Sequence, residues 1–267
     1  MSARLSIITP VFNGMRFIDA CIRNVIEQQC PDAEHIIVDG GSTDGSPQVI
    51  ERYAAEYSHI RWLSEKDRGQ SDAMNKGITL AAGAIIGFLN VDDFYEPGVL
   101  NDVIQRFGNL PAPSLLVGNC AIWDDDEKLL SVSRPAGIGL MNLLQGRYDD
   151  AFPMNASAYF YHKSLHERIG PYETDEHYGM DLHFIFKAVQ QAHVTYVDAL
   201  WGNYRYLKGT KTYEDHMSGM NAVRVTGITE QYRRQQPAYI RAYLCFLNRY
   251  DKLLNWTHRA GSVFRRG

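Results

Sequence analysis

The sequence predicts an α/β fold, with a mostly parallel sheet flanked by helices and a helical tail at the end. Short apolar runs alternate with segments of helical period from residue 4 to about residue 107. Such repetition implies parallel strands joined by right-handed crossovers. The alternation weakens after the Pro-rich segment 111–113, where strand signals become denser.

The first half contains four expected strand–helix pairs. Each strand is a short apolar run, and each helix has apolar residues at three- and four-residue spacing. The expected strands are residues 5–9, 36–38, 60–63 and 85–89. The expected helices are residues 17–26, 46–57, 70–82 and 97–107, and Pro47 and Pro97 suit first turns.

The second half is less regular. Strands are expected at residues 115–117, 121–123, 129–132, 194–197 and 200–206, with a polar hairpin turn at 124–128. Helices are expected at residues 180–191 and from about 215 to 256. The chain therefore divides into residues 1–110, residues 111–213 of the same domain, and a helical, basic tail at residues 214–267.

Composition and charge exclude several classes of protein. The net charge of −4 argues against a general nucleic-acid binder. The four cysteines show no metal or disulfide spacing, which favours a reducing compartment. We find no signal segment and no apolar run approaching the ~20 residues that cross a bilayer. We therefore expect a cytoplasmic protein.

The stretch from Ile85 to Pro97 is the most informative. An apolar strand ends there in two adjacent carboxylates, Asp92 and Asp93. Acids at the carboxyl end of a parallel strand face the crevice where open α/β sheets bind ligands. They are hard oxygen donors, suited to Mg²⁺ or Mn²⁺ that also holds a diphosphate. A solvated turn is the alternative explanation for an isolated Asp-Asp pair.

Two more polar loops follow expected strands, at residues 10–14 and 39–45. In a parallel sheet they would lie at the same edge as residues 90–93, where they offer carboxylates for a base and bare backbone for phosphates. A dinucleotide site would instead want G-x-G-x-x-G after the first strand, and that loop is absent.

Taken in order, four motifs resemble the GT-A glycosyltransferases of family 2, a large inverting family that includes bacterial polysaccharide transferases. The motifs are Ile7-Ile-Thr-Pro-Val-Phe-Asn-Gly14, Ile37-Val-Asp-Gly-Gly-Ser-Thr-Asp-Gly-Ser46, Asp67-Arg-Gly-Gln-Ser-Asp-Ala-Met-Asn-Lys-Gly77 and Phe88-Leu-Asn-Val-Asp-Asp-Phe-Tyr-Glu-Pro97. A weaker match continues through Gly179-Met-Asp181 and Tyr204-Arg205. The resemblance implies a GT-A (Rossmann-like) sheet with an acceptor-side region.

The resemblance also implies a nucleoside site. Asp39 would accept a hydrogen bond from the imide of a uracil or similar base, although a turn Asp is the alternative. The residues that would line the base and border the nucleoside are Thr9, Pro10, Asn13, Asp67, Arg68 and Asp72. Arg68 could equally be a surface cation.

By the same resemblance, Asp92 would hold Mg²⁺ or Mn²⁺, acting as a Lewis acid on the diphosphate. The family's D-x-D motif here reads Asn90-Val-Asp92, so its first carboxylate is an amide, which can still bind ribose or a metal-bound water. This leaves open whether Asp92 alone or with Asp93 contacts the metal. Arg205 would fold over the leaving diphosphate, or belong to a solvated basic loop.

Asp181 is the best match for the base that takes the proton of the acceptor hydroxyl. A helix start also favours a carboxylate, which is the alternative. Glu173 and Asp175 are rival bases in the same acid-rich loop. A metal site built from His177, His183 and Asp181 is disfavoured, because isolated histidines near a helix start are usually surface residues.

The tail is basic and amphipathic. Residues 230–267 carry 8 Lys/Arg and 2 Asp/Glu, and residues 237–257 place aromatic and aliphatic side chains at helical spacing. One interpretation is peripheral contact with an anionic membrane, which suits a lipid-linked acceptor. We favour the alternative, a helix packed on the domain or at a homodimer interface.

We therefore expect an inverting, metal-dependent transferase in bacterial surface polysaccharide synthesis. It would move a sugar from a UDP-, dTDP- or GDP-linked donor to a hydroxyl of a glycan or lipid-linked acceptor, in the cytoplasm or at the inner face of the plasma membrane. One alternative is a nucleotidyltransferase, although residues 9–14 lack the basic residue of its phosphate loop. Another is a non-catalytic nucleotide-sugar-binding scaffold, which the Asn90 departure keeps open.

Overall fold

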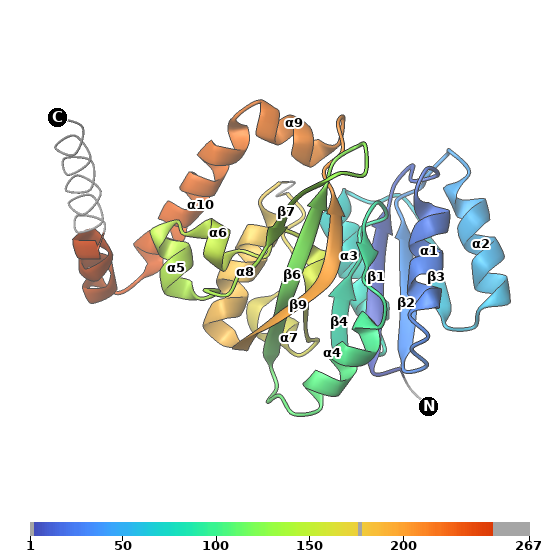
Figure 1. The fold of residues 1–267 in the computed structure, drawn as a ribbon, viewed down its shortest axis with the longest axis horizontal. Helices are drawn as coiled ribbons and strands as arrows, with labels where there is room; N and C mark the ends of the chain where they lie inside the picture. Colours follow the sequence, from blue (N-terminus) through green and yellow to red (C-terminus); the bar gives the residue numbers. More distant parts are fainter. Residues whose placement is uncertain (1–2, 176–177, 248–267) are drawn as a thin grey trace, which may run out of the picture.

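The computed structural model describes residues 3–175 and 178–247. Its centre is one sheet in the order β3-β2-β1-β4-β8-β6-β9-β5, with β7 paired to β6. Helices flank the sheet on both faces (Figure 1). The expected α/β architecture is confirmed.

The first half has the predicted alternation. Its strands are all parallel to their neighbours in this half: β1 (Leu5–Val11), β2 (Ala33–Asp39), β3 (Ile60–Ser64) and β4 (Ile85–Phe88). Its helices are α1 (Ile18–Glu27), α2 (Ser46–Glu56), α3 (Gln70–Leu80) and α4 (Val99–Phe107). A two-residue strand, β5 (Phe94–Tyr95), follows the two carboxylates.

The second half mixes parallel and antiparallel pairs. Its strands are β6 (Ser114–Trp123), β7 (Leu129–Ser133), β8 (Tyr159–His162) and β9 (His193–Arg205). β6 and β9 are each continuous, where the sequence predicted two strands. The pairing of β6 with β9 changes register around Asn119, and Gly118 fits there because a Cβ would lie 2.5 Å from the Trp201 ring. Because of this irregularity, each strand continues through the residues that we had predicted to separate two shorter strands.

Sequence analysis missed β8 and several short helices. β8 inserts antiparallel between β4 and β6, so the sheet continues past the parallel strands without a gap. The short helices are α5 (Leu140–Gln145), α6 (Tyr148–Ala151), a 3₁₀ turn (Ala156–Ala158) and α7 (Leu165–Ile169). Each spans six residues or fewer, so none gives a clear periodic signal.

The core lies on both faces of the sheet, because alternate strand residues point to opposite sides. On one face, Ile8, Ile36 and Phe88 pack with α3 and with α8 (Met180–Gln191). On the other face, Leu5 and Ile7 pack with α1 and α4. The sheet is thus covered on both sides, and its loops at the carboxyl ends of β1–β4 are left as the open edge.

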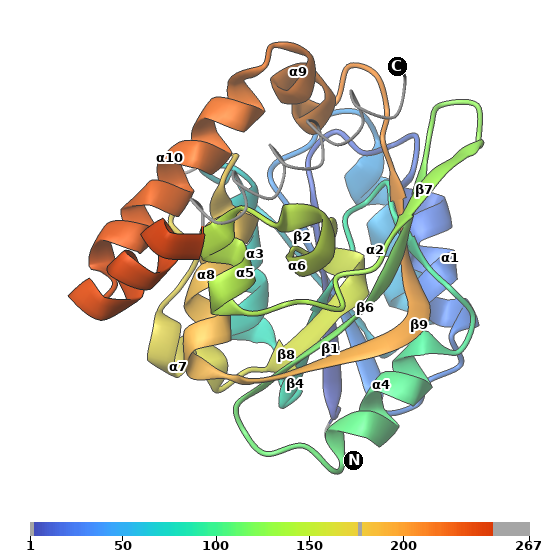
Figure 2. The same cartoon turned by 60° about the vertical axis from the view of Figure 1, so that its left-hand side comes forward.

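The helical tail is interrupted, not continuous. α9 (Lys211–Met217) and α10 (Met220–Gln235) are separated at Gly219, whose φ of 74° is left-handed, and residues 238–247 form a further helix. Both views place α10 at the end of the molecule away from α1 and α2 (Figure 1, Figure 2). The rest of the predicted tail, residues 248–267, lies outside the described residues.

The last described helix is packed on one side only. Leu244 is buried and Ile240 packs against the main core cluster, as the packed-helix alternative expects. Tyr239, Tyr243 and Phe246 on the adjoining side are 74%, 54% and 62% exposed. Within residues 3–175 and 178–247, no helix has both the length and the apolar character needed to span a bilayer.

Candidate functional site

The polar loops after β1 and β2 meet, as the sequence predicted. Asn13 joins them: its backbone N–H donates to the Ser42 hydroxyl at 2.7 Å, and its side-chain oxygen accepts from the Thr43 N–H at 3.0 Å. Asn13 has a φ of 51°, which Asn tolerates better than most residues. We call the loops at residues 10–14, 39–45, 65–69 and 89–93 the carboxyl edge.

Asp39 organises its own loop. Its Oδ2 accepts from the N–H groups of Gly41 and Ser42, both at 3.1 Å, and from the Ser64 hydroxyl at 2.6 Å. The turn role that we gave as the alternative is therefore present. Its Oδ1 receives only a long 3.4 Å contact from the Ser42 N–H within the described chain, so this oxygen has an unfilled acceptor position, although the residue as a whole is fully buried.

Thr9 and Pro10 lie in β1, paired with Ile37 and Val38 of β2. The Thr9 hydroxyl is buried and hydrogen-bonds His35 Nε2 at 2.9 Å. Burial lowers the pKa of His35 to about 3, so this is a neutral pair inside the core. The Thr9 hydroxyl is therefore not available to a ligand.

Asp67 and Asp72 sit at the start of α3. Gly40 packs directly against the Asp67 carboxylate, because a Cβ there would lie 2.4 Å from Oδ2. Asp72 accepts from the Arg68 N–H at 3.2 Å and pairs with the Arg68 guanidinium at 3.4 Å. Apart from this pair the Arg68 side chain is exposed, as expected for the alternative in which Arg68 is a surface cation.

The adjacent carboxylates Asp92 and Asp93 lie in opposite environments. Asp93 is 1% exposed and accepts from Asn90 Nδ2 at 2.9 Å, Asn155 Nδ2 at 2.8 Å and the Arg205 N–H at 3.1 Å. Asp92 is partly exposed, and in the described chain no other residue donates a hydrogen bond to its carboxylate. Burial raises the pKa of both groups, and the Arg205 charge opposes this at Asp92.

Arg205, at the end of β9, is held beside Asp92. Its Nη1 donates to the Asp92 carbonyl at 2.6 Å, and its guanidinium lies 4.6 Å from the centroid of the Phe94 ring. A guanidinium fixed by a carbonyl and an aromatic face is ordered before any anion arrives. It therefore supplies a positive charge at the place where Asp92 supplies a negative one.

Asp181 occupies the first turn of α8 on a different kind of surface. The Tyr159 hydroxyl donates to its Oδ1 at 3.4 Å, and Tyr159, Tyr172 and Phe184 stack at centroid distances of 5.8 and 5.2 Å. Burial raises the pKa of Asp181 to about 6, and the Tyr159 hydrogen bond opposes this rise. We call Asp181 and these three rings the base side.

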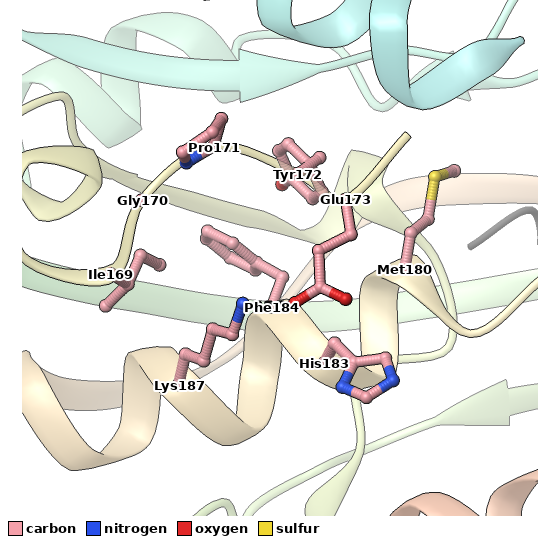
Figure 3. Close-up of a pocket in the computed structure, with 9 residues that line it drawn as sticks. All are labelled: Ile169, Gly170, Pro171, Tyr172, Glu173, Met180, His183, Phe184 and Lys187. Atoms are coloured by element: carbon pink, nitrogen blue, oxygen red, sulfur yellow. Dashed lines mark hydrogen bonds and ion pairs between the residues drawn. The ribbon is translucent and has the colours of Figure 1, made fainter. Parts of the chain in front are cut away.

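The rival bases are less suited. Glu173 pairs with Lys187 at 2.8 Å, and this ion pair lowers the pKa of Glu173. Both residues line a small pocket between the loop after α7 and one face of α8 (Figure 3). Asp175 is exposed, and His177 lies outside the described residues. The described residues contain no cluster of three or more His, Cys, Asp or Glu able to hold a metal ion.

The start of α3 joins the two sides. The Gln70 amide donates to Asn90 Oδ1 at 3.0 Å, and the next residue, Ser71, donates to the Met180 sulfur at 3.0 Å. Met180 directly precedes Asp181. The Asp92 turn and the Asp181 helix start are therefore both attached to the first turn of α3.

Sequence analysis missed three residues of this region: Phe12, Gln70 and Asn155. Phe12 is 65% exposed in the loop after β1, and a large aromatic residue inside a polar loop was a usable signal. Gln70 lies inside a motif quoted for the resemblance, but its partner could not be known. Asn155 had no local signal, because its partner Asp93 is 62 residues away.

Residues 6–168 match the family model for glycosyl transferase family 2, which is more than half of the chain. The chain belongs to glycosyl transferase family 2. This family 2 protein is 32% identical over 103 residues to chondroitin synthase of Escherichia coli, covering 39% of this chain and 15% of that protein. It is 29% identical over 178 residues to a PGL/p-HBAD biosynthesis glycosyltransferase of Mycobacterium tuberculosis, covering 62% of each.

Two solved structures share the fold of this family 2 protein. TarS of S. aureus in complex with UDP-GlcNAc has a TM-score of 0.63 at 18% identity, covering 79% of this chain and 60% of that one. The mannosyltransferase PcManGT from Pyrobaculum calidifontis, in complex with GDP-Man and Mn²⁺, has a TM-score of 0.62 at 17% identity, covering 91% and 70%. The GT-A fold expected from the motifs is confirmed.

Proposed function

We propose that this family 2 protein is an inverting glycosyltransferase that moves a sugar from a nucleotide-diphosphate sugar to a hydroxyl of a glycan or lipid-linked acceptor. One observation carries the proposal. The first turn of α3 attaches to both an accessible carboxylate beside a fixed guanidinium, Asp92 with Arg205, and a carboxylate of raised pKa, Asp181. A single displacement needs these two groups on opposite sides of the sugar: one for the leaving diphosphate and one for the attacking hydroxyl.

The nucleoside would bind at the carboxyl edge. Asp39 Oδ1 retains an acceptor position for the imide or N–H of a base. The exposed ring of Phe12 can stack on a base, since every base has a π-face. Asp67 lies against Gly40 beside that position and could accept from a ribose hydroxyl. The related folds were solved with UDP-GlcNAc and GDP-Man, which supports a nucleotide sugar without choosing its base.

The metal proposed is Mg²⁺ or Mn²⁺ at Asp92. Asp92 fits because it offers two hard oxygens that other described side chains do not occupy, and a relative in fold was solved with Mn²⁺. When bound, the ion would act as a Lewis acid on the diphosphate. Arg205 would hold the departing phosphate oxygens with its remaining N–H donors.

Asp181 is the proposed base. A base works best with a pKa near the operating pH, and burial raises the pKa of Asp181 to about 6. Glu173, whose pKa Lys187 lowers, would hold a proton less well. Asp181 would take the proton of the acceptor hydroxyl as that oxygen attacks the anomeric carbon, and the Tyr159 hydroxyl would steady the carboxylate.

Calorimetric titration tests the donor site. The purified protein is titrated with UDP, dTDP and GDP, each with and without Mn²⁺. We expect tight binding of one diphosphate that requires Mn²⁺ and is lost in Asp92→Ala but kept in Asp126→Ala, a carboxylate in the exposed β6–β7 hairpin. Binding of no diphosphate would overturn the proposal, whereas binding without transfer or donor hydrolysis would favour the scaffold alternative.

We also propose peripheral membrane contact, which suits a lipid-linked acceptor. The support is the exposed stripe of Tyr239, Tyr243 and Phe246, together with the +6 balance of residues 230–267, from 8 Lys/Arg and 2 Asp/Glu. Aromatic residues and basic residues together favour an anionic headgroup layer.

Vesicle flotation tests this contact. We expect the protein to float with vesicles containing phosphatidylglycerol but not with phosphatidylcholine alone. The double variant Tyr239→Ser with Tyr243→Ser should lose the binding, and Leu129→Ser, at another exposed apolar position, should keep it. Equal binding to both vesicles, or dimers that bury the stripe instead, would exclude it.

A further inference from the structure

Asn90 stands where the family motif has a carboxylate, and both its amide oxygen and its amide nitrogen are hydrogen-bonded. Its Oδ1 accepts from Gln70 Nε2 at 3.0 Å, and its Nδ2 donates to Asp93 Oδ2 at 2.9 Å. We propose that Asn90 is a positioning residue that bridges α3 to the Asp92–Asp93 turn, and that an Asp at this position would weaken the metal and diphosphate site. The inference rests on the proposed function, in which Asp92 holds the metal.

The bridge needs an amide because its two ends have opposite requirements. Gln70 offers a donor, so Asn90 must accept there, whereas Asp93 is an acceptor, so Asn90 must donate there. A carboxylate at position 90 could still accept from Gln70 but could not donate to Asp93.

The Asp93 carboxylate connects the residue 90 bridge to two other parts of the chain. Three N–H donors point at it: Asn90 from the same turn, Asn155 from the segment before the 3₁₀ turn, and the Arg205 backbone at the end of β9. These partners lie 3, 62 and 112 residues away in the sequence. Asp93 therefore fixes where the turn stands relative to β9.

The hydrogen bonds of Asp93 set the position of Asp92 relative to Arg205. Arg205 donates its backbone N–H to Asp93 and its Nη1 to the Asp92 carbonyl, so the two neighbouring acids hold the same arginine twice. Loss of the Asn90 donor would leave Asp93 with two partners and break the link from α3 to the Asp93 carboxylate that runs through residue 90. The Asp92 carboxylate and the Arg205 guanidinium would then no longer be preset for one diphosphate.

The competing explanation makes the opposite prediction. If Asn90 were a poor replacement for a metal or ribose ligand, Asn90→Asp would restore the family carboxylate and tighten binding. If Asn90 is a bridge, the same change weakens binding, although it brings the sequence closer to the family motif.

The experiment measures two quantities. Calorimetry gives the affinity for UDP, or for the preferred diphosphate, with and without Mn²⁺, and thermal unfolding gives the melting temperature of the metal-free protein. We expect Asn90→Asp to weaken Mn²⁺-dependent binding at least tenfold and to lower the melting temperature by about 3 °C or more, from the loss of a partly buried hydrogen bond. Asn109→Asp, which adds the same charge at an exposed position of the α4 end, should match the wild type.

Each outcome decides the inference. Equal or tighter binding by Asn90→Asp overturns it. If the wild type binds no diphosphate, the proposed function fails, but the melting temperatures still test the bridge. An unchanged melting temperature in Asn90→Asp would then overturn it.

Discussion

The carboxyl edge and the base side hold their carboxylates in opposite ways. At the carboxyl edge, Asp39 and Asp93 are surrounded by N–H and O–H donors, and Asp92 stands beside a guanidinium. At the base side, Asp181 receives one long hydrogen bond, from a tyrosine whose ring stacks on Phe184. Burial raises the pKa of Asp92, Asp93 and Asp181 alike, so the two sides differ in the hydrogen-bond donors around each carboxyl group. The contrast teaches that one fold can fix one carboxyl group in position and leave another open to accept a proton, by changing the donors that surround the group.

The largest expected effect separates the two sides. Asp181→Asn should lower the transfer rate by about 10²–10⁴-fold, because a general base contributes that much, and it should leave diphosphate affinity within twofold. Steady-state kinetics and calorimetry measure the two quantities. Glu173→Gln is the matched control and should stay near the wild-type rate. If Glu173→Gln loses the rate instead, the base is misassigned.

The stability of Asp181→Asn provides an independent check. Folding raises the pKa of this carboxyl to about 6, so the proton is bound more tightly in the folded state, and ionisation above that pH costs folding free energy. The variant should therefore melt at the same or a higher temperature than the wild type at pH 8. A lower melting temperature at that pH would mean that Asp181 supports the fold.

The next effect belongs to the carboxyl edge. Arg205→Lys keeps the positive charge but loses the planar donors and the stacking on Phe94. We expect about a tenfold loss of Mn²⁺-dependent diphosphate affinity, measured by calorimetry, with an unchanged pH midpoint of the rate. A shift of that midpoint would show that the two sides are electrostatically coupled.

A smaller effect tunes the base side alone. Asp181 must be ionised to accept a proton, so kcat/KM should rise with pH through a midpoint near 6. The Tyr159 hydroxyl stabilises the ionised form, so Tyr159→Phe should move the midpoint to higher pH, by less than about one pH unit, since one unit corresponds to about 1.4 kcal/mol. The pH profile of kcat/KM measures this, and a midpoint that moves to lower pH contradicts it.

The substitution Gly77→Ala should produce the smallest difference between the effects on the two sides. A Cβ there would lie 2.3 Å from Ile8 Cγ2, so Gly77→Ala should push α3 off β1 and cost about 1–3 kcal/mol of stability by overpacking. Because the first turn of α3 holds both sides, affinity and rate should fall together and by similar small factors. Denaturant unfolding and kinetics measure these effects, and a loss confined to one side would exclude α3 as their common support.

The carboxyl edge was more predictable than the base side for physical reasons. Its strands and loops follow each other in the sequence, so parallel order brought Asp39 and Asp92 to one edge. The inward direction of Asp93 was not predictable, because it depends on Asn155 and Arg205, which are distant in the sequence. β8, which carries Tyr159, is short and buried on both faces, so it lacks the alternation that identifies a strand.

The long strand β9 has a consequence for synthesis on the ribosome. It supplies the partner of β5 and the donors of Arg205, which bind a turn 112 residues earlier in the chain. Because translation adds roughly 5–20 residues per second, Arg205 is synthesised about 6–20 s after the turn that contains Asp92. During that interval the nascent chain has the nucleoside loops but not a preset diphosphate site. The order of translation thus delays a competent site until nearly the whole sheet has been made.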